Sequence, residues 1–158
     1  MALRKLPVNT RAEHMRVGIV LSRFNPTIGE LLLKGAARAL AESGVGESAA
    51  VVITVPGALE SPLALQRMAQ TGDYDVLVAL GAVIRGETYH FEIVANESAA
   101  GVASVQLEFG IPIGNGILTT DTIAQAEERA DPDRGDKGGE AARAAIGLAD
   151  LGRRLSRR

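Results

Sequence analysis

The sequence predicts an α/β protein, a three-layer α/β/α sandwich around a four-stranded parallel sheet. Four short segments rich in Val, Ile and Leu alternate with longer segments whose apolar residues recur at helical spacing. This alternation is typical of βαβ crossovers, which produce a parallel sheet covered on both faces. The segment from Tyr74 to Leu80 is apolar apart from Asp75, as in a strand that is buried on both faces.

The predicted strands are bounded by clear turn signals. They cover residues 16–22, 49–55, 76–83 and 111–118, and the second is closed by Pro56 and Gly57. The first helix has its apolar stripe between Ile28 and Leu40 and stops at Ser43-Gly44. The other helices are expected within 60–70, 88–109, 121–130 and 138–155. Pro62 suits a first helical turn, and a Thr-Asp pair can cap the helix at 121.

Composition narrows the class of protein. The chain has 158 residues, which suits one domain, and it contains no Cys, which excludes disulfides and thiolate chemistry. A net charge of -2 gives no reason to expect nucleic acid or a membrane as partner. No apolar run is long enough to span a bilayer, and no signal peptide is recognisable, so we expect a soluble, cytoplasmic protein. Residues 1–15 are polar and irregular, so we divide the chain into an N-terminal arm, 1–15, and a single domain, 16–158.

Familiar cofactor and metal motifs are missing. The sequence has no G-x-x-x-x-G-K-[ST] loop, and its first strand is not followed by G-x-G-x-x-G. The first strand therefore does not indicate a dinucleotide fold. The other histidine besides His90 is His14, in the N-terminal arm, so we do not expect a two-histidine metal site.

Polar and aromatic groups follow the predicted strands. Because ligands bind beyond the carboxyl ends of parallel strands, these groups predict a site for a heterocycle with an anionic group. Phe24 offers a ring for stacking, and Glu60 can accept hydrogen bonds from amines or hydroxyls. Thr88 and neighbouring amides at a helix start can hold an anion, with Arg129 or Lys137 completing a phosphate clamp.

Five motifs occur in the order and spacing of one enzyme family. The sequence from residue 16 to 150 closely resembles the 6,7-dimethyl-8-ribityllumazine synthases, which catalyse the penultimate step of riboflavin biosynthesis. The motifs are Ser22-Arg-Phe-Asn25, Val55-Pro-Gly-Ala-Leu-Glu60, Gly81-Ala-Val-Ile-Arg-Gly-Glu-Thr-Tyr-His-Phe91, Leu118-Thr-Thr-Asp121 and Ala126-Glu-Glu-Arg129 with Asp136-Lys-Gly138.

The resemblance implies a reaction that needs no cofactor or metal. Its substrates are 5-amino-6-(D-ribitylamino)uracil and 3,4-dihydroxy-2-butanone 4-phosphate, and the enzyme is a transferase. It implies that His90 is the proton donor, that Glu87, Thr88 and Arg129 bind the butanone phosphate, and that Lys137 and Glu140 lend charged support. The implied pyrimidine and ribityl contacts are Phe24, Ala58, Leu59, Glu60, Ala82, Val83, Ile84 and Asn115.

The same resemblance implies an assembly. It predicts the flavodoxin-like strand order 2-1-3-4, open to extension by an N-terminal strand from a neighbouring subunit. The expected homo-oligomer is at least a pentamer with each site shared by two subunits, a sixty-subunit shell is left open, and riboflavin synthase is a candidate partner.

Three positions depart from the family pattern. Asn115 stands where many relatives have an aromatic residue, Tyr89 stands where Pro is common, and residues 130–135 contain Pro132 in an atypical linker. Two alternatives remain open at this stage. One is a catalytically weak protein of the same fold that binds flavins or forms shells, and the other is a flavodoxin-like flavin carrier.

Overall fold

A four-stranded parallel sheet with the order β2-β1-β3-β4 forms the centre of the computed structural model, which describes residues 1–156. The strands are β1 (Val17–Ser22), β2 (Ala50–Val55), β3 (Val76–Ile84) and β4 (Ile113–Thr120). All neighbouring strands pair in parallel. The predicted fold class and strand order are therefore confirmed.

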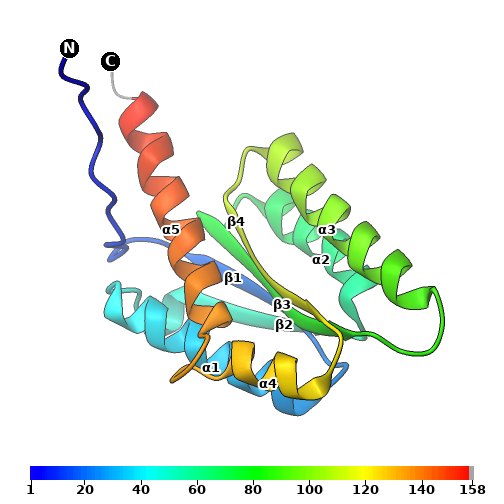
Figure 1. The fold of residues 1–158 in the computed structure, drawn as a ribbon. Coiled ribbons are helices and arrows are strands. Elements are labelled where there is room, and N and C mark those ends of the chain that lie inside the picture. Colours follow the sequence, from blue (N-terminus) through cyan, green and yellow to red (C-terminus); the bar gives the residue numbers. More distant parts are fainter. Residues whose placement is uncertain (157–158) are drawn as a thin grey trace.

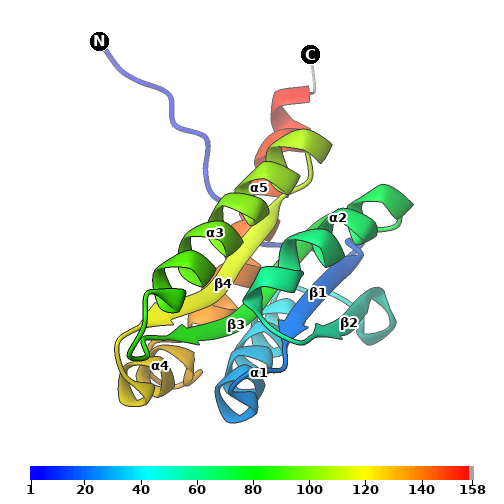
Figure 2. The same ribbon diagram turned by 90° about the vertical axis from the view of Figure 1, so that its right-hand side faces the viewer.

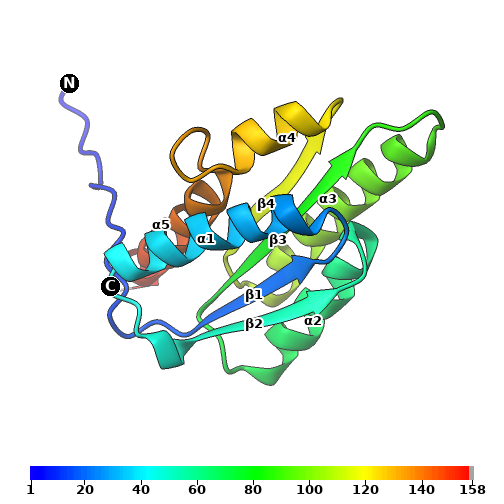
Figure 3. The same cartoon turned by 90° about the horizontal axis from the view of Figure 1, so that it is seen from below.

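Helices cover both faces of the sheet. On one face lie α1 (Pro26–Glu42), α4 (Ile123–Ala130) and α5 (Lys137–Ser156), and on the other lie α2 (Ser61–Thr71) and α3 (His90–Phe109) (Figures 1 and 2). Figure 3 shows the strands side by side, with β2 and β4 at the two edges. Each face carries its own cluster of buried side chains.

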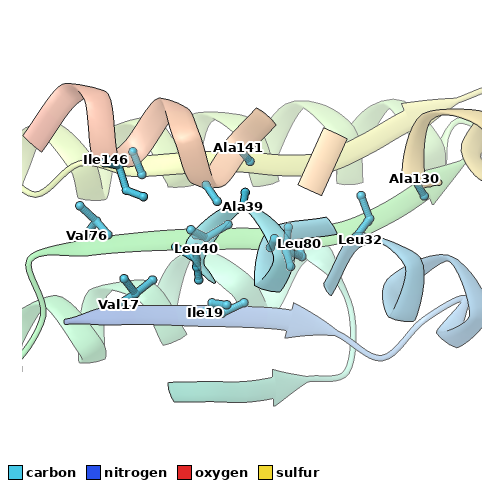
Figure 4. Close-up of a cluster of buried hydrophobic side chains, with 14 of the residues drawn as sticks. Val17, Ile19, Leu32, Ala39, Leu40, Val76, Leu80, Ala130, Ala141 and Ile146 are labelled. Atoms are coloured by element: carbon cyan, nitrogen blue, oxygen red, sulfur yellow. The ribbon is translucent and has the colours of Figure 1, made fainter. Parts of the chain in front are cut away.

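The core under α1 and α5 consists of aliphatic side chains, as expected from a chain with few aromatic residues. Val17, Ile19 and Leu80 point from the sheet toward Leu32 of α1 and Ile146 of α5 (Figure 4). All five side chains are at most 1% exposed. Small residues permit this close packing, since a Cβ on Gly138 would collide with the backbone of Leu32.

Most predicted boundaries agree with the structure to within one or two residues. Pro62 lies in the first turn of α2, as predicted, but residues 58–60 form a separate 3-10 turn (η2, Ala58–Glu60). Before β2 a second such turn, η1, covers Glu47–Ala49. Helix α4 starts later than predicted because Thr122 caps it: its Oγ1 accepts a hydrogen bond from Gln125 N at 3.1 Å.

Strand β4 lies two residues further along the chain than predicted. Gly110, with φ +59°, ends α3, and Ile111 and Pro112 lead into the strand. The strand then continues to Thr120, which pairs with Ile84. Because Arg85 N also donates to Thr120 O at 2.9 Å, β3 and β4 end together at the carboxyl edge of the sheet.

The linker between α4 and α5, which contains Pro132, is held against α1. Arg38 of α1 donates to the carbonyl of Pro132 and, at 2.9 Å, to Asp133 Oδ1. Asp136 has φ +46° immediately before α5 begins, and a Cβ on Gly135 would lie 2.7 Å from the Cα of Arg129. The linker is thus anchored by one arginine and a tight backbone approach.

Residues 1–16 contain no helix or strand, yet part of this segment is buried. Ala12 and Met15 are 2% and 1% exposed in the core beside α1. Further out, the carbonyl of Pro7 accepts a hydrogen bond from Arg154 at 2.6 Å, and the segment runs alongside α5 in Figure 1. Within residues 1–156, no helix is both long and apolar enough to cross a membrane.

Candidate active site

A cavity of about 470 Å³ opens at the carboxyl edge of the sheet, where the loops after β1, β2 and β3 meet. Ligands of parallel α/β proteins bind at this edge. Nine predicted site residues line the cavity: Phe24, Ala58, Leu59, Glu60, Ala82, Val83, Ile84, Thr88 and His90. The structure therefore brings together three motifs that are up to 66 positions apart in the sequence.

Phe24 reaches the cavity from the loop between β1 and α1. Arg23 continues the sheet by donating from its backbone N to Val55 O at 2.8 Å, and Asn25 then takes the left-handed conformation, φ 56°, that starts α1. Between these two fixed points the Phe24 side chain remains 68% exposed. An exposed ring that lines a cavity is available for stacking on a flat ligand.

The second wall of the cavity is the turn after β2. Gly57 N donates to Glu60 Oε2 at 3.0 Å, and Glu60 N donates to Gly57 O at 3.2 Å. This reciprocal pair closes the 3-10 turn η2 and holds Ala58 and Leu59 between its ends. The other carboxylate oxygen of Glu60 has no hydrogen bond within the described residues, so it can accept one from a ligand.

The third wall is the end of β3. A Cβ on Gly81 would lie 2.5 Å from the buried Ser22 Oγ, so glycine allows β1 and β3 to pair closely beneath the site. Ala82, Val83 and Ile84 then form the floor. Residues 85–89 form an exposed loop, and His90 is the first residue of α3, with its backbone N 3.4 Å from Thr88 Oγ1.

Arg85 joins this loop to two other elements. Its Nε donates to Asp121 Oδ1 at 2.8 Å, its Nη1 donates to Glu92, and its guanidinium lies 4.3 Å from the centre of the Phe91 ring. The hydrogen bond to Asp121, followed by that to Glu92, raises the pKa of Arg85 above its ordinary value. The hydrogen bond from Arg85 in turn lowers the pKa of Glu92. Two carboxylates thus balance the charge of Arg85.

The remaining predicted site residues lie outside the cavity. Asn115 is exposed on the edge strand β4, and its Oδ1 accepts a hydrogen bond from Ile117 N at 3.1 Å. Arg129 donates to Gln125 O at 3.1 Å within α4, and Lys137 pairs with Glu140 at 3.0 Å. Glu87 is exposed in the loop beside Thr88. The charged groups predicted for the phosphate therefore do not converge with His90 within one chain.

Five further residues line the cavity: Pro56, Gly57, Gly86, Phe91 and Val94. Phe91 and Val94 form its wall on α3 and also pack against the core under that helix. Apolar residues at helical spacing indicate a core face, so the pattern alone does not reveal that these two residues also line the cavity. Their position beside His90 was the available clue.

A larger hollow of about 750 Å³ lies at the opposite edge of the sheet, between the C-terminal parts of α3 and α5. Its lining includes Gln106, Leu107, Leu148 and Arg153. Gln106 Oε1 is already occupied by Ile113 N at 2.8 Å. The smaller cavity is the candidate site because it combines an aromatic ring, a carboxylate, a hydroxyl and an imidazole at the edge where parallel sheets bind ligands.

The fold and the cavity together define an α/β protein with a small-molecule site beyond its parallel strands. The model of the 6,7-dimethyl-8-ribityllumazine synthase family matches residues 14–153. Curated relatives with that enzyme name include one from Nitrosospira multiformis, 54% identical over 96% of this chain and 92% of its own length. The relative from Ralstonia nicotianae is 53% identical over 92% of this chain and 86% of its own length. The relative from Methylobacillus flagellatus is 50% identical over 97% of this chain and 100% of its own length.

The chain belongs to the 6,7-dimethyl-8-ribityllumazine synthase family. It is accordingly an enzyme of riboflavin biosynthesis, a transferase. The alternative of a catalytically weak binding or shell protein is not favoured, because these relatives carry the name of the enzyme.

Proposed function

We propose that this chain condenses 5-amino-6-(D-ribitylamino)uracil with 3,4-dihydroxy-2-butanone 4-phosphate to give 6,7-dimethyl-8-ribityllumazine, phosphate and water. The observation that carries the site assignment is the convergence of Phe24, Glu60, Thr88 and His90 on one cavity. Family membership supports the reaction, and the cavity supports the residues that perform it.

The pyrimidine substrate occupies the part of the cavity between β1, η2 and β3. Phe24 stacks on its ring, and the backbone of Ala82, Val83 and Ile84 meets the ring edge at the carboxyl end of β3, where ligands of parallel sheets bind. Ala58, Leu59 and Glu60 bind the ribityl chain, with the unoccupied oxygen of Glu60 accepting from its hydroxyls. These groups fix the orientation of the amine that attacks the second substrate.

The butanone phosphate occupies the loop side of the cavity. Backbone N–H groups of Glu87 and Thr88, together with the Thr88 hydroxyl, lie just before the N-terminus of α3, where an anion is favoured. Arg129 supplies the cation, and Lys137 and Glu140 support this end of the site. Arg85 lies nearer in sequence but is already balanced by Glu92 and Asp121.

His90 moves the protons that imine formation, phosphate loss and ring closure require. Its side chain reaches the cavity from the first residue of α3, beside Thr88. Imidazole accepts and releases protons near neutral pH, and one positioned proton donor typically contributes about 10²- to 10⁴-fold. Holding both substrates in reacting orientation contributes about 7 kcal/mol or more, so no cofactor or metal is needed.

The site is completed by a second subunit. Three predicted site residues lie outside the cavity of their own chain: Asn115, Arg129 and Lys137. Their position supports a contribution to the cavity of an adjacent subunit. We propose a ring of at least five subunits, in which residues 16–158 form the domain and residues 1–15 an arm that reaches the next sheet. Strand β2 is an edge strand with no further neighbour among the described residues, as an added strand would require, and Val51 and Val52 on it are 41% and 42% exposed.

Exposed apolar residues also support assembly. Leu63 of α2 and Ile93 and Leu107 of α3 are 55%, 46% and 82% exposed on the helices that cover one face. A cyclic oligomer would bury such residues. We place the assembly in the cytoplasm, where a sixty-subunit shell and association with riboflavin synthase are further forms to test.

The direct test is to mix the purified protein with both substrates and record lumazine fluorescence and phosphate release. We expect both signals in equal amounts without added metal or cofactor. A flavodoxin-like carrier would instead bind flavin and release no phosphate. Absence of product from a folded, oligomeric protein would refute the proposed reaction.

A further inference from the structure

Arg85 occupies a central position at the site without lining the cavity. It follows β3 directly, and its side chain contacts α3 through Phe91 and Glu92 and the end of β4 through Asp121. Its backbone is fixed as well, since Arg85 N donates to Thr120 O. One guanidinium therefore connects three separate segments of the chain.

The segment that Arg85 connects has few other side-chain hydrogen bonds, although Phe91 and Val94 pack against the core. The loop 85–89 is exposed, and within residues 1–156 its Tyr89 side chain makes no hydrogen bond that caps α3. The weak contact of 3.4 Å between His90 N and Thr88 Oγ1 is the side-chain hydrogen bond at this helix start. Among side-chain polar contacts, the ion pair between Arg85 and Glu92 is therefore the main one that holds the first turn of α3.

Arg85 anchors that turn on both sides. The Phe91 ring packs toward the cavity and the core, with the guanidinium near its outer face, and Glu92 binds the same guanidinium. Both residues directly follow His90. A planar guanidinium can stack and donate in two directions at once, which a lysine ammonium cannot reproduce.

We propose that Arg85 is a positioning residue that fixes the first turn of α3, and with it His90 and the loop that carries Thr88. This inference rests on the proposed function, since the geometry of His90 matters only if His90 transfers protons. Arg85 touches neither substrate. It acts by holding the imidazole and the phosphate loop in one orientation relative to the pyrimidine wall.

The test compares Arg85→Gln, Arg85→Lys and Glu92→Gln, with Arg67→Gln of α2 as a matched control that loses only an exposed contact to Gln70. We expect Arg85→Gln to lower kcat on the order of 10- to 100-fold, because small displacements of reacting groups have effects of that size. KM for the pyrimidine substrate should stay within about twofold, since its proposed binding walls do not involve Arg85. Arg85→Lys should recover only part of kcat, and the control should match the wild-type protein.

A double-mutant cycle separates positioning from general stability. If Arg85 acts through Glu92, Arg85→Gln/Glu92→Gln should lose no more kcat than Arg85→Gln alone. Unchanged kcat in correctly assembled Arg85→Gln, or strictly additive losses, would overturn the inference. If Arg85→Gln fails to fold, Glu92→Gln, which keeps the arginine, must by itself lower kcat with an unchanged pyrimidine KM.

Hydrogen–deuterium exchange tests the same inference without activity. Amides of residues 86–93 should exchange faster in Arg85→Gln than in the wild-type protein, while residues 57–65 should not change. Equal exchange of residues 86–93 in both proteins would refute the anchoring role. A wild-type protein that forms no lumazine would refute the proposed reaction, whereas the exchange result would still decide whether Arg85 anchors the turn.

Discussion

The two halves of the candidate site differ in how far one chain can build them. The half formed by the ends of β1, β2 and β3 is a cavity with Phe24, Glu60 and His90 already in place. The half on β4, α4 and the start of α5 presents Asn115 and Arg129 to solvent. One chain thus provides the cavity that we propose for the heterocycle and the imidazole that we propose as proton donor, but it does not bring the proposed phosphate cation, Arg129, to that cavity.

This difference has a physical origin. A rigid, partly apolar pocket can be formed by strand ends and backbone turns of a single sheet, and it stays stable without a ligand. The attraction between a cation and a phosphate is strongest when assembly buries the surface around them, because water then screens the two charges less. The following predictions test whether the second half serves a neighbouring subunit, in order of decreasing effect.

The largest effect is expected from the cavity half. His90→Ala should lower turnover by about 10²- to 10⁴-fold while folding and assembly stay intact, because the imidazole is exposed and supports no core packing. Steady-state kinetics with both substrates gives the measurement. His14→Ala, at the other histidine, is the control and should have wild-type turnover. An unchanged kcat in His90→Ala would remove His90 from proton transfer.

The second half should affect one substrate selectively. If assembly desolvates the ion pair between Arg129 and the phosphate, Arg129→Ala should weaken transition-state stabilisation by about 2–4 kcal/mol. The loss should appear mainly as a lower kcat/KM for the butanone phosphate. Arg129→Lys should recover only part of this, because an ammonium cannot form two parallel hydrogen bonds. Arg134→Ala, which removes a neighbouring exposed ion pair with Glu128, is the control. Equal losses for both substrates would indicate a structural defect.

Mixed oligomers test the sharing of the site directly. When His90→Ala and Arg129→Ala chains are refolded together in equal amounts, about one quarter of the shared sites should contain both intact halves. Activity should therefore reappear in the mixture although each variant alone has little. A fully active monomer by light scattering, or no recovery in verified mixed oligomers, would contradict a shared site.

The sequence predicted the cavity half better than the other half for a physical reason. Buried apolar runs ended by Gly, Pro or Asn locate strand ends to within one or two residues, and parallel strands bring those ends together. Phe24, Glu60 and His90 therefore had to meet. Contacts between distant segments have no such local sign: Asp121 is 36 residues from Arg85, and nothing in the sequence links the two.

Strand β4 shows the same limit of prediction from sequence, because its packing depends on a segment far along the chain. A Cβ on Gly114 would collide with the backbone of Ala141, so this glycine is required by the approach of α5, which lies far along the chain. From the sequence, glycines at 114 and 116 look merely like weak strand formers. The roles of Asn115, Arg129, Lys137 and Glu140 depend on a neighbouring subunit and stay predictions.

The smallest effect concerns Asn115, on the half that we assign to the neighbour's site. Asn115→Phe should tighten binding of the pyrimidine substrate and of riboflavin-like ligands by about 0.5–1.5 kcal/mol, because a second ring could stack opposite Phe24. The position is exposed, so the larger side chain need not disturb the core, and the Ile117 N–H that now donates to Asn115 Oδ1 becomes free to bind water. Fluorescence titration of the assembled protein measures the gain, and Asn115→Leu, which adds apolar area without a ring, is the control. Equal affinities for the Phe variant and the wild-type protein, with the oligomer preserved, would mean that residue 115 does not face the pyrimidine.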